Sequence, residues 1–346
     1  MEKIIYVVDK KNSALYTAAS SRIALSGGKI LIANEYISPQ HLLKSIYKEG
    51  GGIVLFCWRK VLGDIISLNR SLKIYKEFDD NFTFAFLIPD HMGLETKFEN
   101  IETKMINASE YYVVTSKLLF DQYTAKYPTK PPKKIYHDLP NLKLIEEVRK
   151  NFQKNTSQKT KIIWVGNSKW GRRQGYNDHK GFEKYVRPLK EHCEKYLNNI
   201  TVEIIDSSVN SLNQLETLRR IRDSDILIQV SKNEGTGIVI LEAIGLETQV
   251  LTSHVGITDE FFSIDDHQIL KDKSVHGILT NIGNLTDNKS TEILRRKYEE
   301  YVENARSENL VSADKTREFV KLNSRFLNFT VSAFWFYRFI YNKLFH

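Results

Sequence analysis

Cysteine is scarce in this sequence, and its scarcity limits the chemistry that the chain can support. The two cysteines, Cys57 and Cys193, lie in separate halves and belong to no pairing motif. This excludes a disulfide framework and argues against a zinc site, so we expect a reducing compartment, the cytoplasm. The apolar run at residues 4–8 is too short for a signal peptide and is typical of a first strand.

Blocks of like charge are absent as well. The 50 Lys and Arg residues exceed the 42 Asp and Glu residues, which gives a formal charge of +8, but they are scattered along the chain. No nucleic-acid-binding motif is visible, so we expect acidic ligands and no nucleic-acid partner. With 41% hydrophobic and 27% charged residues, the 346-residue chain has the composition of a globular protein and the length of two domains.

In the first half, short β-rich runs alternate with stretches of helical periodicity. The predicted strands are residues 4–8, 30–33, 53–58, 82–88 and 111–115, and the predicted helices are residues 14–25, 41–47 and 62–78. This alternation predicts a parallel, doubly wound sheet. We assign residues 1–145 to an N-terminal Rossmann-like domain.

The same alternation restarts after a polar stretch, which we interpret as a linker at residues 146–160. The predicted strands are residues 161–165, 202–205, 226–230 and 249–252, with helices at 181–197, at 212–223 and from about Gly237. Residues 161–315 then form a second Rossmann-like domain. We expect an α/β fold with two doubly wound parallel-sheet domains facing across a cleft, because open sheets bind ligands at the carboxyl ends of their strands.

The C-terminal segment, residues 316–346, has a different composition. Aromatic residues are dense in 334–337, and basic Arg338 and Lys343 lie among them. The segment is too short and polar for a membrane span. Two alternatives stay open: a helix packed on the protein, or a helix lying on an anionic membrane.

The most informative segment is residues 231–245, which follows a predicted strand and opens a helix. Gly235 and Gly237 let the backbone approach a ligand, and the free amides of the new helix favour a phosphate or a sugar oxygen. Seven residues separate Glu234 from Glu242, so the two carboxylates can reach different points of one ligand. The alternative is a pair of ordinary surface carboxylates.

In this setting the pattern resembles the donor-site signature of retaining glycosyltransferases of the two-Rossmann-domain (GT-B) architecture, family 4 and its relatives. Residues 250–260 are similar to the strand and Gly-containing loop that follow the glutamates in that family. Residues 161–166 resemble the first strand and glycine of the donor domain, and residues 179–182 its Lys-Gly motif. The resemblance covers most of residues 160–262 in the right order.

The resemblance implies a nucleotide-diphospho-sugar as substrate, with no cofactor and no metal. It implies that Lys180 contacts the diphosphate, Glu242 the ribose hydroxyls and Glu234 the transferred sugar. The implied donor-binding residues are Gly166, Lys180, Gly235, Thr236, Gly237, Ile238 and Glu242. A lysine and helix amides can offset the diphosphate charge without a metal.

Two further positions carry weight in this resemblance. His91 follows a predicted strand and matches the family's cleft histidine, which implies a catalytic role beside Glu234; a structural role is the alternative. The family usually has an arginine where Asn167 stands, and Arg172 or Arg173 can supply the missing phosphate contact. We set aside the Asp-Ser-Asp sequence at 223–225 as a metal site, because it lies at a helix end.

The expected activity is retaining transfer to a glycan or lipid-linked acceptor, in surface polysaccharide or glycoconjugate synthesis. Peripheral contact with an anionic membrane at its cytoplasmic face would fit such an acceptor. The alternatives are a nucleotide-sugar epimerase and a non-catalytic binding or scaffold protein, which Asn167 favours.

Overall fold

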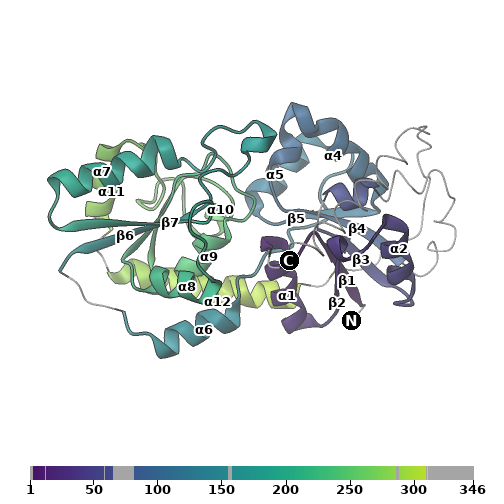
Figure 1. Cartoon of the computed structure of the whole chain (residues 1–346). Coiled ribbons are helices and arrows are strands. Elements are labelled where there is room, and N and C mark those ends of the chain that lie inside the picture. Colours follow the sequence, from purple (N-terminus) through teal and green to yellow (C-terminus); the bar gives the residue numbers. More distant parts are fainter. Residues whose placement is uncertain are drawn as a thin grey trace. The chain divides into compact units, whose positions relative to one another are not determined.

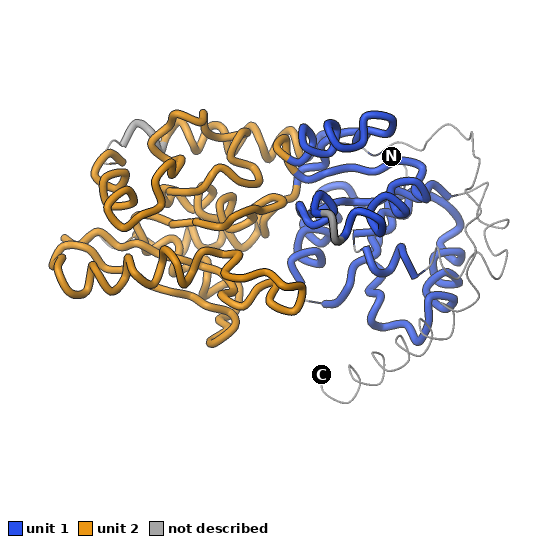
Figure 2. Tube along the Cα trace, turned by 90° about the horizontal axis from the view of Figure 1, so that it is seen from above, with its two compact units in different colours: residues 1–115, 119–137, 306–346 blue, residues 116–118, 138–305 orange. Residues whose placement is uncertain are grey.

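The computed structural model describes residues 3–11, 13–57, 59–64, 82–154, 158–285, 288–308 and 310. The chain divides into two compact units, coloured separately in Figure 2. Unit 1 comprises residues 1–115, 119–137 and 306–346, and unit 2 comprises residues 116–118 and 138–305. Of the helix predicted at 62–78, residues 62–64 are described and are helical; the rest of it and the C-terminal segment 316–346 lie outside the described residues.

Unit 1 contains a five-stranded parallel sheet, and each strand predicted for the first half is confirmed. The strands are β1 (Ile4–Val8), β2 (Lys29–Ile32), β3 (Gly52–Phe56), β4 (Phe82–Ile88) and β5 (Tyr111–Val114), in the order β2-β1-β3-β4-β5 (Figure 1). The helices are α1 (Ala14–Ser26), α2 (Pro39–Tyr47), α4 (Thr96–Ala108) and α5 (Lys117–Lys126). The hydroxyls of Ser13 and Ser38 cap α1 and α2 by accepting hydrogen bonds from the first-turn amides.

The strands of unit 1 are buried on both faces, as a parallel sheet requires. In β3, Val54 and Phe56 belong to one hydrophobic cluster, whereas Ile53 and Leu55 belong to another. Because side chains alternate across a strand, the two clusters are the two faces of the sheet. This explains why the strands read as continuous apolar runs.

Unit 2 contains a second parallel sheet, made of β6 (Thr160–Gly166), β7 (Ile200–Asp206), β8 (Ile226–Gln229) and β9 (Gln249–Thr252) in the order β7-β6-β8-β9. All four predicted strands are confirmed. The helices are α6 (Leu142–Asn151), α7 (Arg187–Tyr196), α8 (Gln214–Arg222), α9 (Ile238–Gly245), α10 (Thr258–Phe261), α11 (Val275–Asn284) and α12 (Asn288–Ser307). A π-helical turn, η5 (Phe182–Val186), leads into α7, so the helix predicted at 181–197 has an irregular first turn.

Helix α6 occupies part of the stretch interpreted as a linker, and it buries Ile145 and Val148. The compact units divide at residues 137 and 138 and again at 305 and 306. The domain boundaries predicted at 145, 160 and 315 stay predictions. Within the described part of the chain, no helix is long and apolar enough to cross a membrane.

Unit 1 is completed by the residues that follow α12. The Glu308 carboxylate accepts hydrogen bonds from Arg22 Nη2 at 2.6 Å and from the backbone N–H of His137 at 3.0 Å. The Arg22 guanidinium lies 4.1 Å from the centroid of the Tyr136 ring, and Leu310 is buried in the same hydrophobic cluster. Residues from both ends of the chain therefore build one unit.

In each parallel sheet the strand order reverses at the first strand, because the next two strands of the chain pair with it on opposite sides. This switch point falls between β1 and β3 in unit 1 and between β6 and β8 in unit 2. Loops leaving the carboxyl ends of two such strands diverge and leave room for a ligand. The switch point of unit 2 lies where β6 ends at Gly166 and β8 ends at Gln229.

Candidate functional site

Two loops meet at the switch point of unit 2, residues 167–181 after β6 and residues 230–237 after β8. The backbone N–H of Lys232 donates to the carbonyl of His179 at 2.9 Å, and His179 Nε2 hydrogen-bonds the carbonyl of Asn233 at 2.9 Å. Gly181 has φ of 68°, and a Cβ there would lie 2.6 Å from the carbonyl oxygen of Val230. Only glycine allows this approach.

The contact between the loops places Lys180 against Glu234. Lys180 Nζ lies 2.5 Å from Glu234 Oε1, and Gln229 Nε2 donates to the same oxygen at 2.7 Å. The two charged side chains are 17% and 13% exposed. Burial alone would raise the pKa of Glu234, but the Lys180 ammonium outweighs burial and holds that pKa below its ordinary value. Glu234 is therefore an ionised carboxylate.

Glu242 lies in a different electrostatic environment on α9. Its side chain is buried, and the burial outweighs the hydrogen bond from Gln214, so its pKa rises to about 7. Gln214 Nε2 donates to its Oε1 at 3.4 Å. Two carboxylates seven residues apart thus differ in charge near neutral pH, and differing environments of this kind assign differing roles.

The start of α9 is fixed by the loop that follows β9. Gly237, the residue before the helix, has φ of 76°. Gly256 has φ of 60°, and a Cβ there would lie 2.3 Å from the carbonyl oxygen of Thr236, which accepts from the Ile257 N–H at 3.0 Å. Thr236 Oγ1 donates to Asp138 Oδ2 at 2.6 Å. The turn at residues 235–237 is therefore fixed by Ile257 through the Thr236 carbonyl and by Asp138 through the Thr236 hydroxyl.

The beginning of the loop after β6 is ordered by a buried carboxylate. Asp206 Oδ1 accepts hydrogen bonds from the backbone N–H groups of Ser168 at 3.1 Å and Ser208 at 2.9 Å. Asn167 Oδ1 accepts from the N–H of Lys169 at 2.9 Å. The Asn167 side chain thus closes a turn of its own loop.

The two arginines considered as phosphate contacts lie in the same loop. Both are exposed, in η4 (Arg172–Gln174). Arg172 lines a hollow of about 590 Å³ that also includes Arg187 and residues of β7. Lys180 faces Glu234 on the β8 side of the loop. Phosphate contact by Arg172 or Arg173 stays a prediction.

In unit 1, His91 follows β4 and is buried, with Nε2 3.6 Å from Glu95 Oε1. Its neighbour Asp90 accepts from Arg59 Nη1 at 2.9 Å and from the Met92 N–H at 2.8 Å. Burial would raise the pKa of Asp90, but Arg59 outweighs it and lowers that pKa. The Arg59 guanidinium thus holds Asp90, which lies between the end of β4 and His91.

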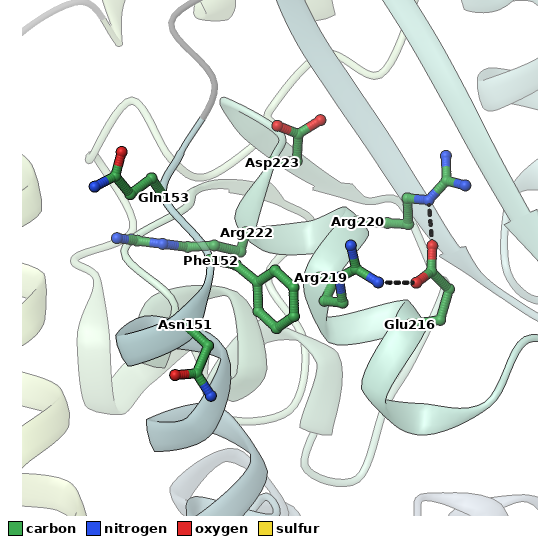
Figure 3. A pocket seen from close by; sticks show the side chains of 8 residues that line it. All are labelled: Asn151, Phe152, Gln153, Glu216, Arg219, Arg220, Arg222 and Asp223. Carbon is green, nitrogen blue, oxygen red and sulfur yellow. Dashed lines mark hydrogen bonds and ion pairs between the residues drawn. The ribbon is translucent and has the colours of Figure 1, made fainter.

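A pocket of about 410 Å³ lies at the opposite, amino-terminal edge of the sheet in unit 2 (Figure 3). Arg219 and Arg220 point toward Glu216 in it, and the Arg219 guanidinium lies 4.1 Å from the Phe152 ring centroid. Asp223, which also lines the pocket, is 2.6 Å from Lys161 Nζ at the start of β6. The Asp-Ser-Asp sequence is therefore part of this edge and lies away from Lys180 and Glu234.

Residues 135–308 match the protein family described as glycosyl transferases group 1. The match spans half of the chain and includes the whole switch-point site of unit 2. This chain belongs to that family. No curated protein matches its sequence.

Solved structures share the fold of this group 1 glycosyl transferase. A sucrose-phosphate synthase from Thermosynechococcus elongatus is 13% identical with a TM-score of 0.60, and the likeness covers 99% of both chains. A UDP-forming α,α-trehalose-phosphate synthase from Burkholderia xenovorans, in complex with glucose-6-phosphate, is 8% identical with a TM-score of 0.63 over 88% of this chain and 97% of that one. The Anabaena protein HepE, in complex with UDP-glucose, is 11% identical with a TM-score of 0.53 over 87% and 94%. The predicted family and GT-B fold are confirmed.

The structure brings together most of the residues predicted for this glycosyl transferase in unit 2. Lys180 and Glu234 are in contact, Gly235, Thr236 and Gly237 form the turn before α9, and Ile238 and Glu242 lie on that helix. Gly166 ends β6, with its Cα close to the Trp164 ring. Sequence reasoning missed Asp138, Asp206 and Glu102. The signal for Glu102 is its place on the apolar stripe of α4, three and four residues before buried Met105 and Ile106.

Proposed function

We propose that this protein transfers a sugar from a nucleotide-diphospho-sugar to an acceptor hydroxyl and binds the donor at the switch point of unit 2. The observation that carries the proposal is the contact of Lys180 with Glu234, beside a helix that bears Glu242. A cation, free helix amides and two carboxylates are the groups that a diphosphate, a sugar and a ribose require.

In the proposed reaction, Lys180 offsets the negative charge that builds up on the departing nucleoside diphosphate. The amides at the start of α9 add partial positive charge at the same place. Glu234, which is ionised, accepts hydrogen bonds from the hydroxyls of the transferred sugar. Glu242 accepts hydrogen bonds from the ribose. On donor binding, Lys180 and Glu234 thus exchange their contact with each other for contacts with the diphosphate and with the transferred sugar.

We propose that transfer retains the anomeric configuration and needs no metal. Glu234 positions the sugar and does not attack it, so the acceptor hydroxyl approaches from the face that the diphosphate leaves. His91 of unit 1 hydrogen-bonds the sugar or the acceptor. The cation at Lys180 and the helix amides take the part that a metal plays elsewhere.

For the acceptor we propose a glycan or a lipid-linked sugar, as in the synthesis of surface polysaccharides or glycoconjugates, at the cytoplasmic face of a membrane. The aromatic and basic residues at 326–346 and the charge of +8 support contact with anionic lipid. Sedimentation with vesicles of anionic and of neutral lipid tests this contact. We expect binding to anionic vesicles that weakens as salt is added. No binding to either kind of vesicle, or equal binding to both kinds, contradicts the proposal.

The decisive experiment is a thermal-shift screen with nucleoside diphosphates, followed by NMR of the reaction with the nucleotide-sugars that bind. A ligand at 100 times its Kd adds about 2.7 kcal/mol of stability. An axial or equatorial product linkage that matches the donor establishes retention. Stabilisation by no nucleotide would overturn the proposal. Binding without transfer or hydrolysis indicates a binding protein, and an altered sugar without transfer indicates an epimerase.

A further inference from the structure

The loop after β6 gathers three rings immediately before Lys180. The Trp170 ring centroid lies 4.4 Å from that of His179 and 5.5 Å from that of Tyr176, and Tyr176 meets His179 edge-on at 5.1 Å. Gly171 has φ of 73°, and a Cβ there would lie 2.7 Å from the Tyr176 ring. The close packing around this glycine shows that the rings form one packed cluster.

Lys180 lies against this ring cluster on one side and against Glu234 on the other. Its Nζ is 5.5 Å from the Trp170 ring centroid, within the range of a cation–π interaction. His179 anchors the cluster to the loop after β8 through the carbonyl of Asn233. The ammonium group is thus bounded by the face of an indole ring and by a carboxylate.

The two neighbours of Lys180 differ in what they do to its charge. A carboxylate neutralises an ammonium group and competes with any anion that approaches it. An aromatic face carries no formal charge, so it restrains the lysine without neutralising it. A free lysine side chain has about 2 kcal/mol of rotamer entropy to lose on binding an anion, and a ring that restricts it beforehand lowers that cost.

We propose that Trp170 is a positioning residue that holds Lys180 in place for the diphosphate of the donor. The inference rests on the proposed function for the identity of the anion. When Glu234 turns to the sugar, the indole face keeps Lys180 at the loop junction with its full charge. Trp170 thereby strengthens the binding of the phosphates and leaves the rest of the donor unaffected.

The first test compares ligands with and without the diphosphate. In Trp170→Ala we expect the Kd for the best nucleoside diphosphate to rise roughly tenfold, in line with the loss of one desolvated cation–π contact. The Kd for the corresponding nucleoside should stay unchanged. Trp170→Phe retains a ring, so its Kd for the nucleoside diphosphate should stay within about threefold of the wild-type value. This variant controls for misfolding of the loop.

The matched control is Tyr196→Ala. Lys195 Nζ lies 4.9 Å from the Tyr196 ring centroid on the exposed face of α7, so this variant removes a similar contact elsewhere in unit 2. Its nucleotide affinity should equal that of the wild type. Equal losses for nucleoside and diphosphate in Trp170→Ala, or no rescue by Trp170→Phe, would overturn the proposal.

The second test needs no nucleotide. The rate at which an amine-acylating reagent modifies Lys180, followed by mass spectrometry of its peptide, should rise several-fold in Trp170→Ala and remain low in Trp170→Phe. Equal rates in the wild type and Trp170→Ala overturn the positioning role whatever the nucleotides do. Faster labelling in a protein that binds no nucleotide supports the positioning of Lys180 and refutes the proposed function instead.

Discussion

Arg59 and Glu102 form a largely buried ion pair in unit 1, with side chains 16% and 0% exposed. Arg59 Nε lies 2.5 Å from Glu102 Oε2, and Nη2 lies 3.1 Å from Oε1. Glu102 is fully buried and also accepts from the Tyr123 hydroxyl at 2.9 Å. The remaining arm of the guanidinium reaches Asp90, the residue before His91. One cation thus connects α4 to the carboxyl end of β4.

Glu102→Ala should therefore be strongly destabilising. Removing Glu102 leaves the Arg59 guanidinium, which is 16% exposed and retains Asp90, only partly paired, so we expect a cost of about 3 kcal/mol, the lower end for buried pairs. Glu146→Ala is the control, because its ion pair with Lys150 on α6 is exposed and its loss should change the stability little. Urea unfolding of both variants measures the difference, and similar free energies of unfolding would contradict it.

Glu242 should make stability depend on pH. Burial raises its folded-state pKa to about 7, above the ordinary value of 4.5, so the folded state binds the proton more tightly. The stabilising contribution is complete below pH 4.5 and is lost as pH rises to 7, by about 3 kcal/mol at most. Glu242→Gln mimics the protonated form. Its unfolding free energy should exceed that of the wild type above pH 7 and match it below pH 4.5; parallel pH curves would refute the assignment.

Glu242→Ala should weaken donor binding while leaving the fold intact. The loss of hydrogen bonds between a carboxylate and ribose hydroxyls predicts a Kd at least about tenfold higher for a nucleotide-sugar. Glu194→Ala, on exposed α7, should bind like the wild type. Calorimetric titration measures both affinities. Unchanged affinity in Glu242→Ala would remove this residue from the donor site.

Gly256→Ala should disrupt the turn before α9. The variant combines a left-handed backbone with a Cβ placed 2.3 Å from the Thr236 carbonyl oxygen, and we expect a cost of about 3 kcal/mol with loss of nucleotide binding. Gly50 also has a positive φ, 80°, but open space around its Cα. Gly50→Ala should cost only about 1 kcal/mol. Equal melting temperatures for the two variants would show that the close contact has no energetic weight.

Transferase activity should survive chelation by EDTA, since the proposed charge compensation comes from Lys180 and helix amides. The assay compares initial rates with and without EDTA, and after adding back magnesium or manganese. Full loss with recovery by either metal would revive a metal-dependent mechanism. In that case the Asp-Ser-Asp sequence would still need a different conformation, because Asp223 pairs with Lys161.

The sequence predicts the strands of both sheets well, because strands buried on both faces are short continuous apolar runs with little ambiguity. It does not predict the contact of Lys180 with Glu234: the resemblance implies a diphosphate contact for Lys180 and a sugar contact for Glu234, and both roles stay predictions. Helix α6 is not predicted, because most of its residues are polar. Its apolar stripe is narrow and consists of Leu142, Ile145 and Val148, which follow the cap residue Asn141. The periodicity of this stripe indicates a helix, whereas the charged residues around it favour a linker.

The supporting contacts of the site could not be predicted, for a physical reason. Thr236 and Asp138 are 98 residues apart, and Arg59 and Glu102 are 43 apart. Glu102 has a local signal in its place on the apolar stripe of α4, but nothing local in the sequence states which residue pairs with it, and the same holds for Thr236 and Asp138. The contact of Trp170 with Lys180 is not predicted either, since nothing in a single sequence states which lysine an indole ring will face.

Because Glu308 belongs to unit 1 while unit 2 occupies residues 138–305, the order of synthesis determines which unit can close first. At translation rates of about 5–20 residues per second, the ribosome needs on the order of ten seconds or more to pass from His137 to Glu308. During this interval the nascent unit 1 holds Arg22 without its carboxylate, whereas unit 2 already has all of its sequence by residue 305. A chain that ends at residue 305 because of a premature stop would therefore leave the ribosome with the whole sequence of unit 2, while Arg22 in unit 1 would lack its Glu308 partner.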